Sequence, residues 1–147
     1  GKVNRFPCKT LRSIGRNARG VRGIKLGEGQ SVISMIAKSE RGKVLTVTEN
    51  GFGKRTDLKL FRETSRGGVG VMSMRLTRKT GLVIGAVSID DNDEILLLSS
   101  GGIMVRLKAA DISLIGRQTQ GVKLINLAEQ ESLVAVQSIK EPVEEVE

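Results

Sequence analysis

The feature that most constrains this chain is a pattern that recurs three times along it. Each copy places an arginine before a glycine turn that leads into an apolar segment, and the copies occupy residues 15–26, 65–76 and 116–127. The turn glycines Gly20, Gly70 and Gly121 are 50 and 51 residues apart. A period of this length is typical of repeat architectures, in which each repeat is one supersecondary unit. We therefore expect one structural unit in three copies, with any surface charge laid out as a periodic array.

Each repeat divides into four short segments, most of them rich in β-branched or aliphatic residues, as strands are. The first segments are 1–6, 51–56 and 102–107, and the second are 21–26, 71–76 and 122–127. The third are 32–37, 83–88 and 133–138, and the fourth are 44–48 and 95–99. Asn50-Gly51 and Gly101-Gly102 predict tight hairpins between a fourth and a first segment, because these residues tolerate positive φ. In the second segments, the predicted core residues are Val21, Val71, Val122, Leu26, Leu76 and Leu127.

Four short strands per unit at this period predict an all-β, propeller-like fold of about three four-stranded blades. Three blades are too few for a usual ring, which has four to eight. We expect one partial propeller domain over 1–140, with repeats at about 1–50, 51–101 and 102–140. Residues 141–147 carry four glutamates and form a predicted disordered acidic tail.

The charge of the chain points to a polyanionic partner, either a nucleic acid or an acidic membrane surface. The 24 Lys and Arg residues exceed the 16 Asp and Glu residues, which leaves a net charge of +8. This excess is graded, with net +8 in residues 1–50, +2 in 51–100 and −2 in 101–147. With one cysteine and no histidine, neither an intrachain disulfide nor a zinc site is expected, and the compartment should be reducing. No apolar run is long enough to span a membrane.

Arginines recur at two positions of the repeat and cluster in the first repeat. One register holds Arg5, Arg55 and Arg106, and the other holds Arg16, Arg66 and Arg117. The stretch with Arg12, Arg16, Arg19 and Arg22 contains no acid and is interrupted by glycines, so we predict a loop with about one helical turn. Guanidinium groups suit phosphate oxygens. For the register of Arg5, a solvated outer face or pairing with nearby acids is the alternative role.

Other chemistry finds little support in the chain. Residues 51–55 superficially resemble a phosphate-binding loop, but they lack its spacing and lie in a predicted hairpin. The acidic residues Asp90, Asp91, Asp93 and Glu94 lack the glycine and distal glutamate of a calcium loop, so a solvated turn is favoured. No catalytic residue and no metal ligand is predicted.

The repeated Gly-Arg-x-x-x-Gly-Val pattern, the 50–56 hairpin and residues 115–122 resemble the C-terminal domain of the DNA gyrase A protein. The family domain is a six-bladed β-pinwheel with DNA bent around a basic rim, so the resemblance implies the later three blades of such a disc. The family carries a Gln-Arg-Arg-Gly-Gly-Lys-Gly box in its first blade. Residues 64–70 keep Arg66, Gly67, Gly68 and Gly70 of it but lack the glutamine, one arginine and the lysine.

The resemblance implies sequence-tolerant binding and bending of double-stranded DNA in support of ATP-dependent negative supercoiling. It implies partners in the rest of gyrase A and in gyrase B, ATP and Mg²⁺ elsewhere in the holoenzyme, no cofactor in this chain, and a bacterial cytoplasmic, nucleoid-associated location. The family cleaves DNA through a tyrosine, and this chain has none, so it is not expected to be an enzyme by itself. The predicted DNA-binding residues are Arg5, Arg12, Arg16, Arg19, Arg22, Lys54, Arg55, Arg66, Arg106 and Arg117.

Two alternatives remain open from the sequence. One is the related C-terminal domain of topoisomerase IV. The other is a propeller fragment that binds protein, through self-association or otherwise, by its open blade edges, its basic charge serving only solubility.

Overall fold

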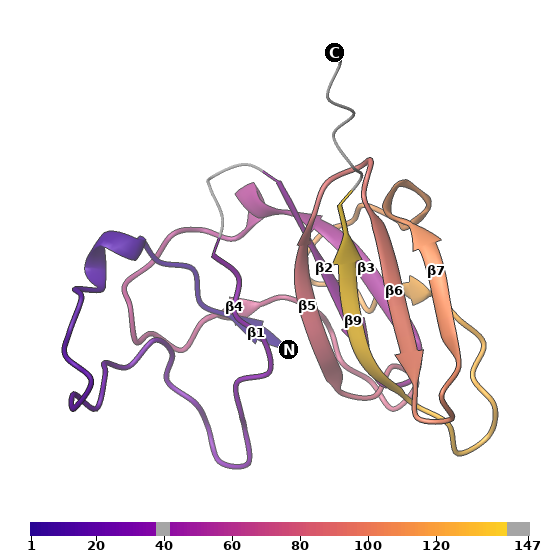
Figure 1. The fold of residues 1–147 in the computed structure, drawn as a ribbon, viewed down its shortest axis with the longest axis horizontal. Coiled ribbons are helices and arrows are strands. Elements are labelled where there is room, and N and C mark those ends of the chain that lie inside the picture. Colours follow the sequence, from indigo (N-terminus) through magenta and orange to yellow (C-terminus); the bar gives the residue numbers. More distant parts are fainter. Residues whose placement is uncertain (38–41, 141–147) are drawn as a thin grey trace.

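The computed structural model describes residues 1–37 and 42–140, and within them it is all-β apart from three short 3₁₀ turns (Figure 1). The turns are η1 (Cys8–Thr10), η2 (Leu58–Leu60) and η3 (Ala109–Asp111). No helix in these two ranges is long and apolar enough to cross a membrane. The predicted all-β architecture is confirmed, whereas the predicted acidic tail lies outside the described residues.

The strands form three antiparallel sheets of unequal size. The largest has the order β5 (Val83–Ile89), β2 (Lys43–Thr48), β3 (Phe52–Asp57) and β8 (Val122–Lys123). The second has the order β7 (Met104–Lys108), β6 (Glu94–Ser99) and β9 (Leu133–Ile139), and β1 (Lys2–Val3) pairs with β4 (Val71–Met72). Among the described residues, a single sheet therefore has the four strands expected of each blade.

Each sheet draws its strands from more than one sequence repeat. In the largest sheet, β2 is the fourth segment of the first repeat, β3 and β5 belong to the second, and β8 belongs to the third. The hairpins β2–β3 and β6–β7 turn where Asn50-Gly51 and Gly101-Gly102 predicted them, with φ of +85° at Gly51 and +80° at Gly102. The repeats are consequently interlocked rather than separate blades.

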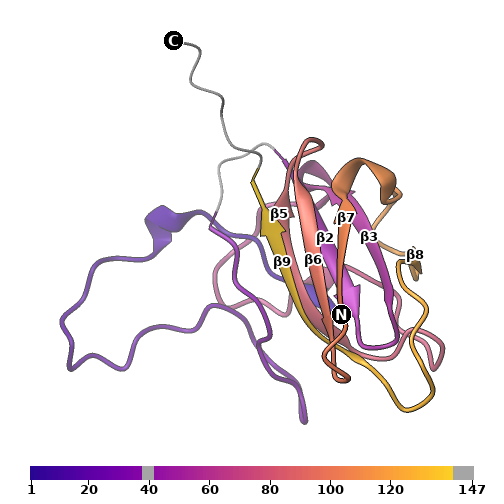
Figure 2. The ribbon, with the colours of Figure 1, turned by 45° about the vertical axis from the view of Figure 1, so that its right-hand side comes forward.

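The core lies between the two larger sheets, whose strands β5 and β9 run side by side in Figures 1 and 2. Alternate residues of β2 and β6 point into it, as a period of two requires. Fully or almost fully buried apolar residues of this core are Leu45, Val47, Ile89, Ile95, Leu97, Ala109, Ile112 and Leu133. Leu124, Ile125 and Leu127 of the third repeat pack against this core.

The first repeat is the most open part of the described chain. Its third segment, residues 32–37, forms no strand, and Met35 is 91% exposed. The corresponding segments β5 and β9 pair with the fourth segments β2 and β6, and no described strand takes that place beside 32–37. The second segments form two-residue strands at most, so Val21, Leu26 and Val122 are exposed and their prediction as core residues was wrong.

Candidate nucleic-acid interface

The predicted loop with four arginines, residues 12–22, extends away from the sheets and is exposed along its whole length (Figure 1). It contains a single turn, closed by a hydrogen bond from the amide of Ala18 to the carbonyl of Gly15. Among the described residues, nothing forms a hydrogen bond or an ion pair with the side chains of Arg12, Arg16, Arg19 and Arg22. We call residues 12–22 the basic loop, and no group in the described part of the chain occupies its four guanidinium groups.

The register that holds Arg5, Arg55 and Arg106 has a different role from the predicted one, because its first two members bind the next repeat. Arg5 donates from Nη1 to the carbonyls of Leu58 (3.2 Å) and Phe61 (2.8 Å). Arg55, only 7% exposed, donates from Nε to the carbonyl of Ile112 at 2.7 Å and from Nη1 to Asp91 at 2.6 Å. Since η2 and η3 are equivalent turns 51 residues apart, both arginines anchor the 3₁₀ turn of the following repeat.

Arg106, the third member of this register, faces outward and pairs with Glu94 on the neighbouring strand β6. No described turn lies beyond it in the place that η2 and η3 take for Arg5 and Arg55. Pairing with an acid, the alternative considered for this register, therefore applies to Arg106 and in part to Arg55.

Lys54 is the clearest departure from the predicted set, because its side chain is completely buried. Its Nζ donates to the carbonyls of Gly116 (2.7 Å), Arg117 (2.8 Å) and Thr119 (3.1 Å), and to the Thr119 hydroxyl (3.1 Å). Burial, with a smaller effect of the nearby Arg117 cation, lowers the pKa of Lys54 to about 8. Direct contact of Lys54 with a phosphate is thus excluded in this conformation, and so is that of the buried Arg55.

The loop arginines Arg66 and Arg117 reach back to the preceding repeat. Nη1 of Arg66 donates to the carbonyl of Arg22 at 2.9 Å, and Nη1 of Arg117 donates to the carbonyl of Met72 at 2.8 Å. These two acceptors occupy the same repeat position, 50 residues apart. Both arginines are half-buried, and Nε of Arg66 is buried without a hydrogen-bond partner among the described residues.

The glycines that follow these arginines allow close packing of the loops. Gly70 and Gly121 have φ of +78° and +77°, and a Cβ atom at either would lie 2.7 Å from a carbonyl oxygen, that of Val3 or of Gly53. These oxygens occupy equivalent positions in the first strand of the preceding repeat. The repeated glycine therefore serves packing between repeats as well as the turn.

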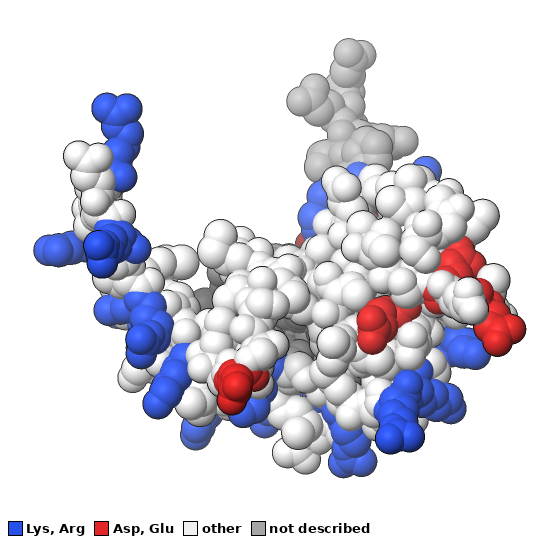
Figure 3. Space-filling model, turned by 90° about the horizontal axis from the view of Figure 1, so that it is seen from below, with Lys and Arg blue, Asp and Glu red and all other residues white. Residues whose placement is uncertain are grey.

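Several exposed cations were not among the predicted residues. They include Lys2, Lys9, Lys25, Lys59, Arg62, Arg75, Arg78, Lys79, Lys108 and Lys123. A signal for some of them was present, since Lys25 and Arg75, Lys9 and Lys59, and Arg12 and Arg62 are pairs at the 50-residue period. Figure 3 shows Lys and Arg side chains at intervals along the margin of the molecule, from the first repeat on the left to the opposite end, with fewer acids among them.

The acidic turn at 90–94 is tied to basic residues. Asp91 pairs with Lys43 at 2.5 Å and Arg55 at 2.6 Å, and the hydrogen bond from Lys43 is the main cause that lowers the pKa of Asp91. The carboxylate of Asp93, which is 6% exposed, accepts from the amide of Asp90 and from Lys140. Within residues 1–37 and 42–140 no group of His, Cys, Asp or Glu is arranged to hold a metal ion.

This fold and this surface define a class: an all-β, propeller-like repeat domain with interlocked repeats and a basic margin. A protein-family model described as the DNA gyrase C-terminal domain, a beta-propeller, matches residues 1–37, 42–90 and 93–140. The DNA gyrase A protein of Escherichia coli K12 is 47% identical over 145 residues, and that of Pseudomonas aeruginosa is 47% identical over 142. The chain therefore belongs to the family of DNA gyrase C-terminal domains, as the resemblance indicated.

Solved structures agree with this assignment. The structure of a DNA gyrase A C-terminal domain superposes with a TM-score of 0.83 and 32% identity, and the match covers 95% of this chain and 48% of that one. The C-terminal domain of a DNA topoisomerase IV superposes with a TM-score of 0.87 at 24% identity, which shows the shared fold alone. Gyrase A is the better supported of the two. The match to the E. coli gyrase A protein takes in 99% of this chain but only 17% of that protein.

Proposed function

We propose that this chain binds double-stranded DNA without strong sequence preference and bends it along the basic margin. The observation that carries the proposal is the basic loop, with four exposed arginines that have no partner among the described residues. A duplex carries about one negative charge per 1.7 Å of its axis, so cations spaced along a margin neutralise the backbone and release counterions. No described helix could enter a groove to read bases, which favours contacts to the backbone.

Within a gyrase, the bound DNA would be presented to the rest of gyrase A and to gyrase B for ATP-dependent negative supercoiling. The ATP and Mg²⁺ would act in those other parts, and this chain would work as a non-catalytic, DNA-binding portion. The relatives are bacterial, and we propose the bacterial cytoplasm, with the nucleoid, as its location.

The test is a titration of DNA affinity against salt with the intact protein and duplexes of increasing length. If about six phosphates are contacted, log K should fall against log salt with a slope of about −5. Bending predicts that affinity also rises with duplex length until the margin is filled. A slope near zero would refute electrostatic binding, and a full slope without length dependence would refute bending but keep binding.

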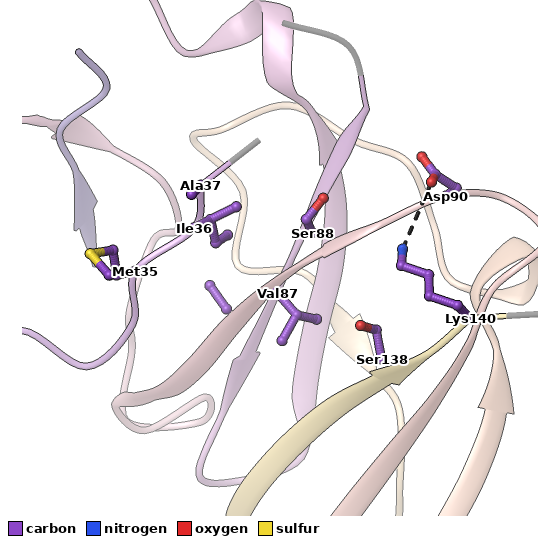
Figure 4. A pocket seen from close by; sticks show the side chains of 9 residues that line it. Met35, Ile36, Ala37, Val87, Ser88, Asp90, Ser138 and Lys140 are labelled. Carbon is purple, nitrogen blue, oxygen red and sulfur yellow. Dashed lines mark ion pairs between the residues drawn. The ribbon is translucent and has the colours of Figure 1, made fainter. Parts of the chain in front are cut away.

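A second candidate function is protein binding at the open third segment of the first repeat. Residues 35–37, β5 and β9 line an open, shallow groove of about 450 Å³, shown in Figure 4 with Met35, Val87 and Ser138 around it. Val32, Ile33 and Met35 are exposed apolar residues beside it. Self-association through this edge would appear in analytical ultracentrifugation as a concentration-dependent mass, with or without DNA, and Met35→Asp would abolish it.

A further inference from the structure

The buried ammonium group of Lys54 lies inside the loop of the next repeat, where it makes no contact with solvent. We propose that Lys54 is a positioning residue, which holds residues 116–119 in the shape that the third repeat presents to DNA, rather than a ligand of the phosphate backbone. This proposal rests on the DNA-binding function proposed above, but its structural half can be tested without DNA.

The geometry around Lys54 is that of a template for the loop. Three carbonyls, of Gly116, Arg117 and Thr119, and the Thr119 hydroxyl all lie 2.7–3.1 Å from Nζ. An ammonium group has three donors, so these four acceptors use its whole capacity. All are neutral dipoles of one loop, and no carboxylate is among them. Lys54 therefore gathers the carbonyls of a tight turn that would otherwise repel one another.

The gathered loop is fixed to the second repeat at two further points. Arg117 donates to the carbonyl of Met72 at 2.8 Å, and the carbonyl of Thr119 accepts from the amide of Arg75 at 3.0 Å. Lys123 and Arg75, both exposed, lie at or just beyond these contacts along the chain. A change in the conformation of this loop would consequently displace Arg75 and Lys123.

The equivalent residue of the preceding repeat supports the same role with different chemistry. Asn4 lies 50 residues before Lys54, and its Nδ2 donates to the carbonyls of Ser65 (3.2 Å) and Gly23 (2.8 Å). Ser65 is the counterpart of Gly116, and the hydroxyl of Thr64 donates to Asn4 Oδ1 at 2.8 Å. A neutral amide cannot neutralise a phosphate. The role that Asn4 and Lys54 share is therefore to hold the equivalent loop of the next repeat.

Amine footprinting of the unmodified protein separates the two roles without any variant. We expect Lys54 to resist acetylation by an N-hydroxysuccinimide ester both without and with duplex DNA. Lys59, Lys79 and Lys123 should react in the free protein, and those that meet DNA should become protected by it. Reactive Lys54 that DNA protects would overturn the proposal. If no lysine is protected by DNA, the proposed function fails while resistance of Lys54 still supports the template.

Variants then test what Lys54 does for the loop. In Lys54→Met, the amides of 116–124 should exchange about tenfold faster or more, because charge-assisted hydrogen bonds are lost. The salt slope of DNA binding should also fall, because the loop no longer holds Arg75 and Lys123 in place, and Lys54→Asn should recover the slope although its side chain carries no charge. Lys54→Asn, which copies Asn4, should restore most of the protection.

Lys59→Met is the matched control, because Lys59 is exposed and its ammonium group has no partner among the described residues. If Lys59 contacts DNA, its replacement lowers the salt slope by up to about 0.9 and leaves amide exchange unchanged. Unchanged exchange in Lys54→Met, or no recovery in Lys54→Asn, would refute the template. If Lys54→Met fails to fold, the footprinting result alone decides.

Discussion

The basic loop should supply most of the DNA affinity of the chain, and replacing its arginines tests this directly. The perturbation is Arg12→Gln, Arg16→Gln, Arg19→Gln and Arg22→Gln together. All four side chains are exposed and have no partner among the described residues, so the change should leave the fold intact. Circular dichroism and the melting temperature should match those of the unmodified protein.

The expected size follows from counterion release. Each phosphate contact contributes about 0.9 to the slope of log K against log salt, so four lost contacts reduce the slope by about 3.6. Raising the salt about fourfold, from roughly 50 to 200 mM, should lower the DNA affinity of both proteins. The loss of affinity should be about 150-fold smaller for the variant than for the unmodified protein. This is the upper limit, reached when all four arginines contact phosphate at once.

The assay is fluorescence anisotropy of a labelled duplex at four or more salt concentrations. A comparison variant in the third repeat carries Arg106→Gln, Lys108→Gln and Lys123→Gln, where the local net charge is lowest. Because it loses three cations and the quadruple variant loses four, the slope changes are compared per replaced cation, and we expect a clearly smaller value for the third repeat. An equal or larger change, or an unchanged slope in the quadruple variant, would refute the argument from the charge gradient.

Three further predictions concern the contacts between repeats. Arg55→Met leaves the carbonyl of the buried Ile112 without its side-chain donor and removes one of the two cations that pair with Asp91, the other being Lys43. Calorimetry should therefore show a loss of unfolding free energy of about 2 kcal/mol, and a loss below about 1 kcal/mol would contradict the role of Arg55 as an anchor. The lowered pKa of Asp91 means that its stabilising effect is present above pH 3.8 and is lost as the pH falls below that value, so the stability difference from Asp91→Asn should shrink in acid. The Cβ atom added by Gly20→Ala meets no atom within 4 Å, so this change should lower the free energy of unfolding by about 1 kcal/mol. Gly121→Ala has nearly the same φ, but its Cβ atom would lie 2.7 Å from the Gly53 carbonyl oxygen, so the loss should be at least twice as large. Equal urea midpoints for the two variants would disprove the packing role of Gly121.

The sequence predicted best those features that depend on neighbouring residues. The hairpins at Asn50-Gly51 and Gly101-Gly102 follow from local φ preferences, and strands β5, β6 and β9 follow from apolar runs between turns. The predicted strand at 32–37 was wrong because a strand requires a partner. This segment is rich in apolar residues, as β5 is, but no described strand lies where β2 lies for β5.

The roles of the arginines could not be predicted, because burial depends on contacts far along the chain. Arg5, Arg55 and Arg106 share a register and look alike in the sequence. Two are enclosed by turns that begin about 50 residues later, while Arg106 meets only Glu94 on an adjacent strand among the described residues. Spacing identified the register correctly, but only the packing of the next repeat decides whether its cation meets backbone carbonyls or solvent.

The difference between buried and exposed cations limits where the charge of each repeat can vary. The buried cations donate hydrogen bonds to backbone carbonyls of the next repeat, so replacing one of them disturbs that repeat as well. The exposed side chains are not needed for packing between the repeats, so their identity can change. For example, position 22 is arginine in the first repeat, and the equivalent positions 72 and 123 are methionine and lysine, each of them exposed. The fall in net charge from +8 to −2 along the chain is therefore compatible with one repeated architecture. It follows that the strength of the proposed DNA binding can be tuned repeat by repeat through the exposed positions alone, whereas the path of the margin is set by the residues that join the repeats.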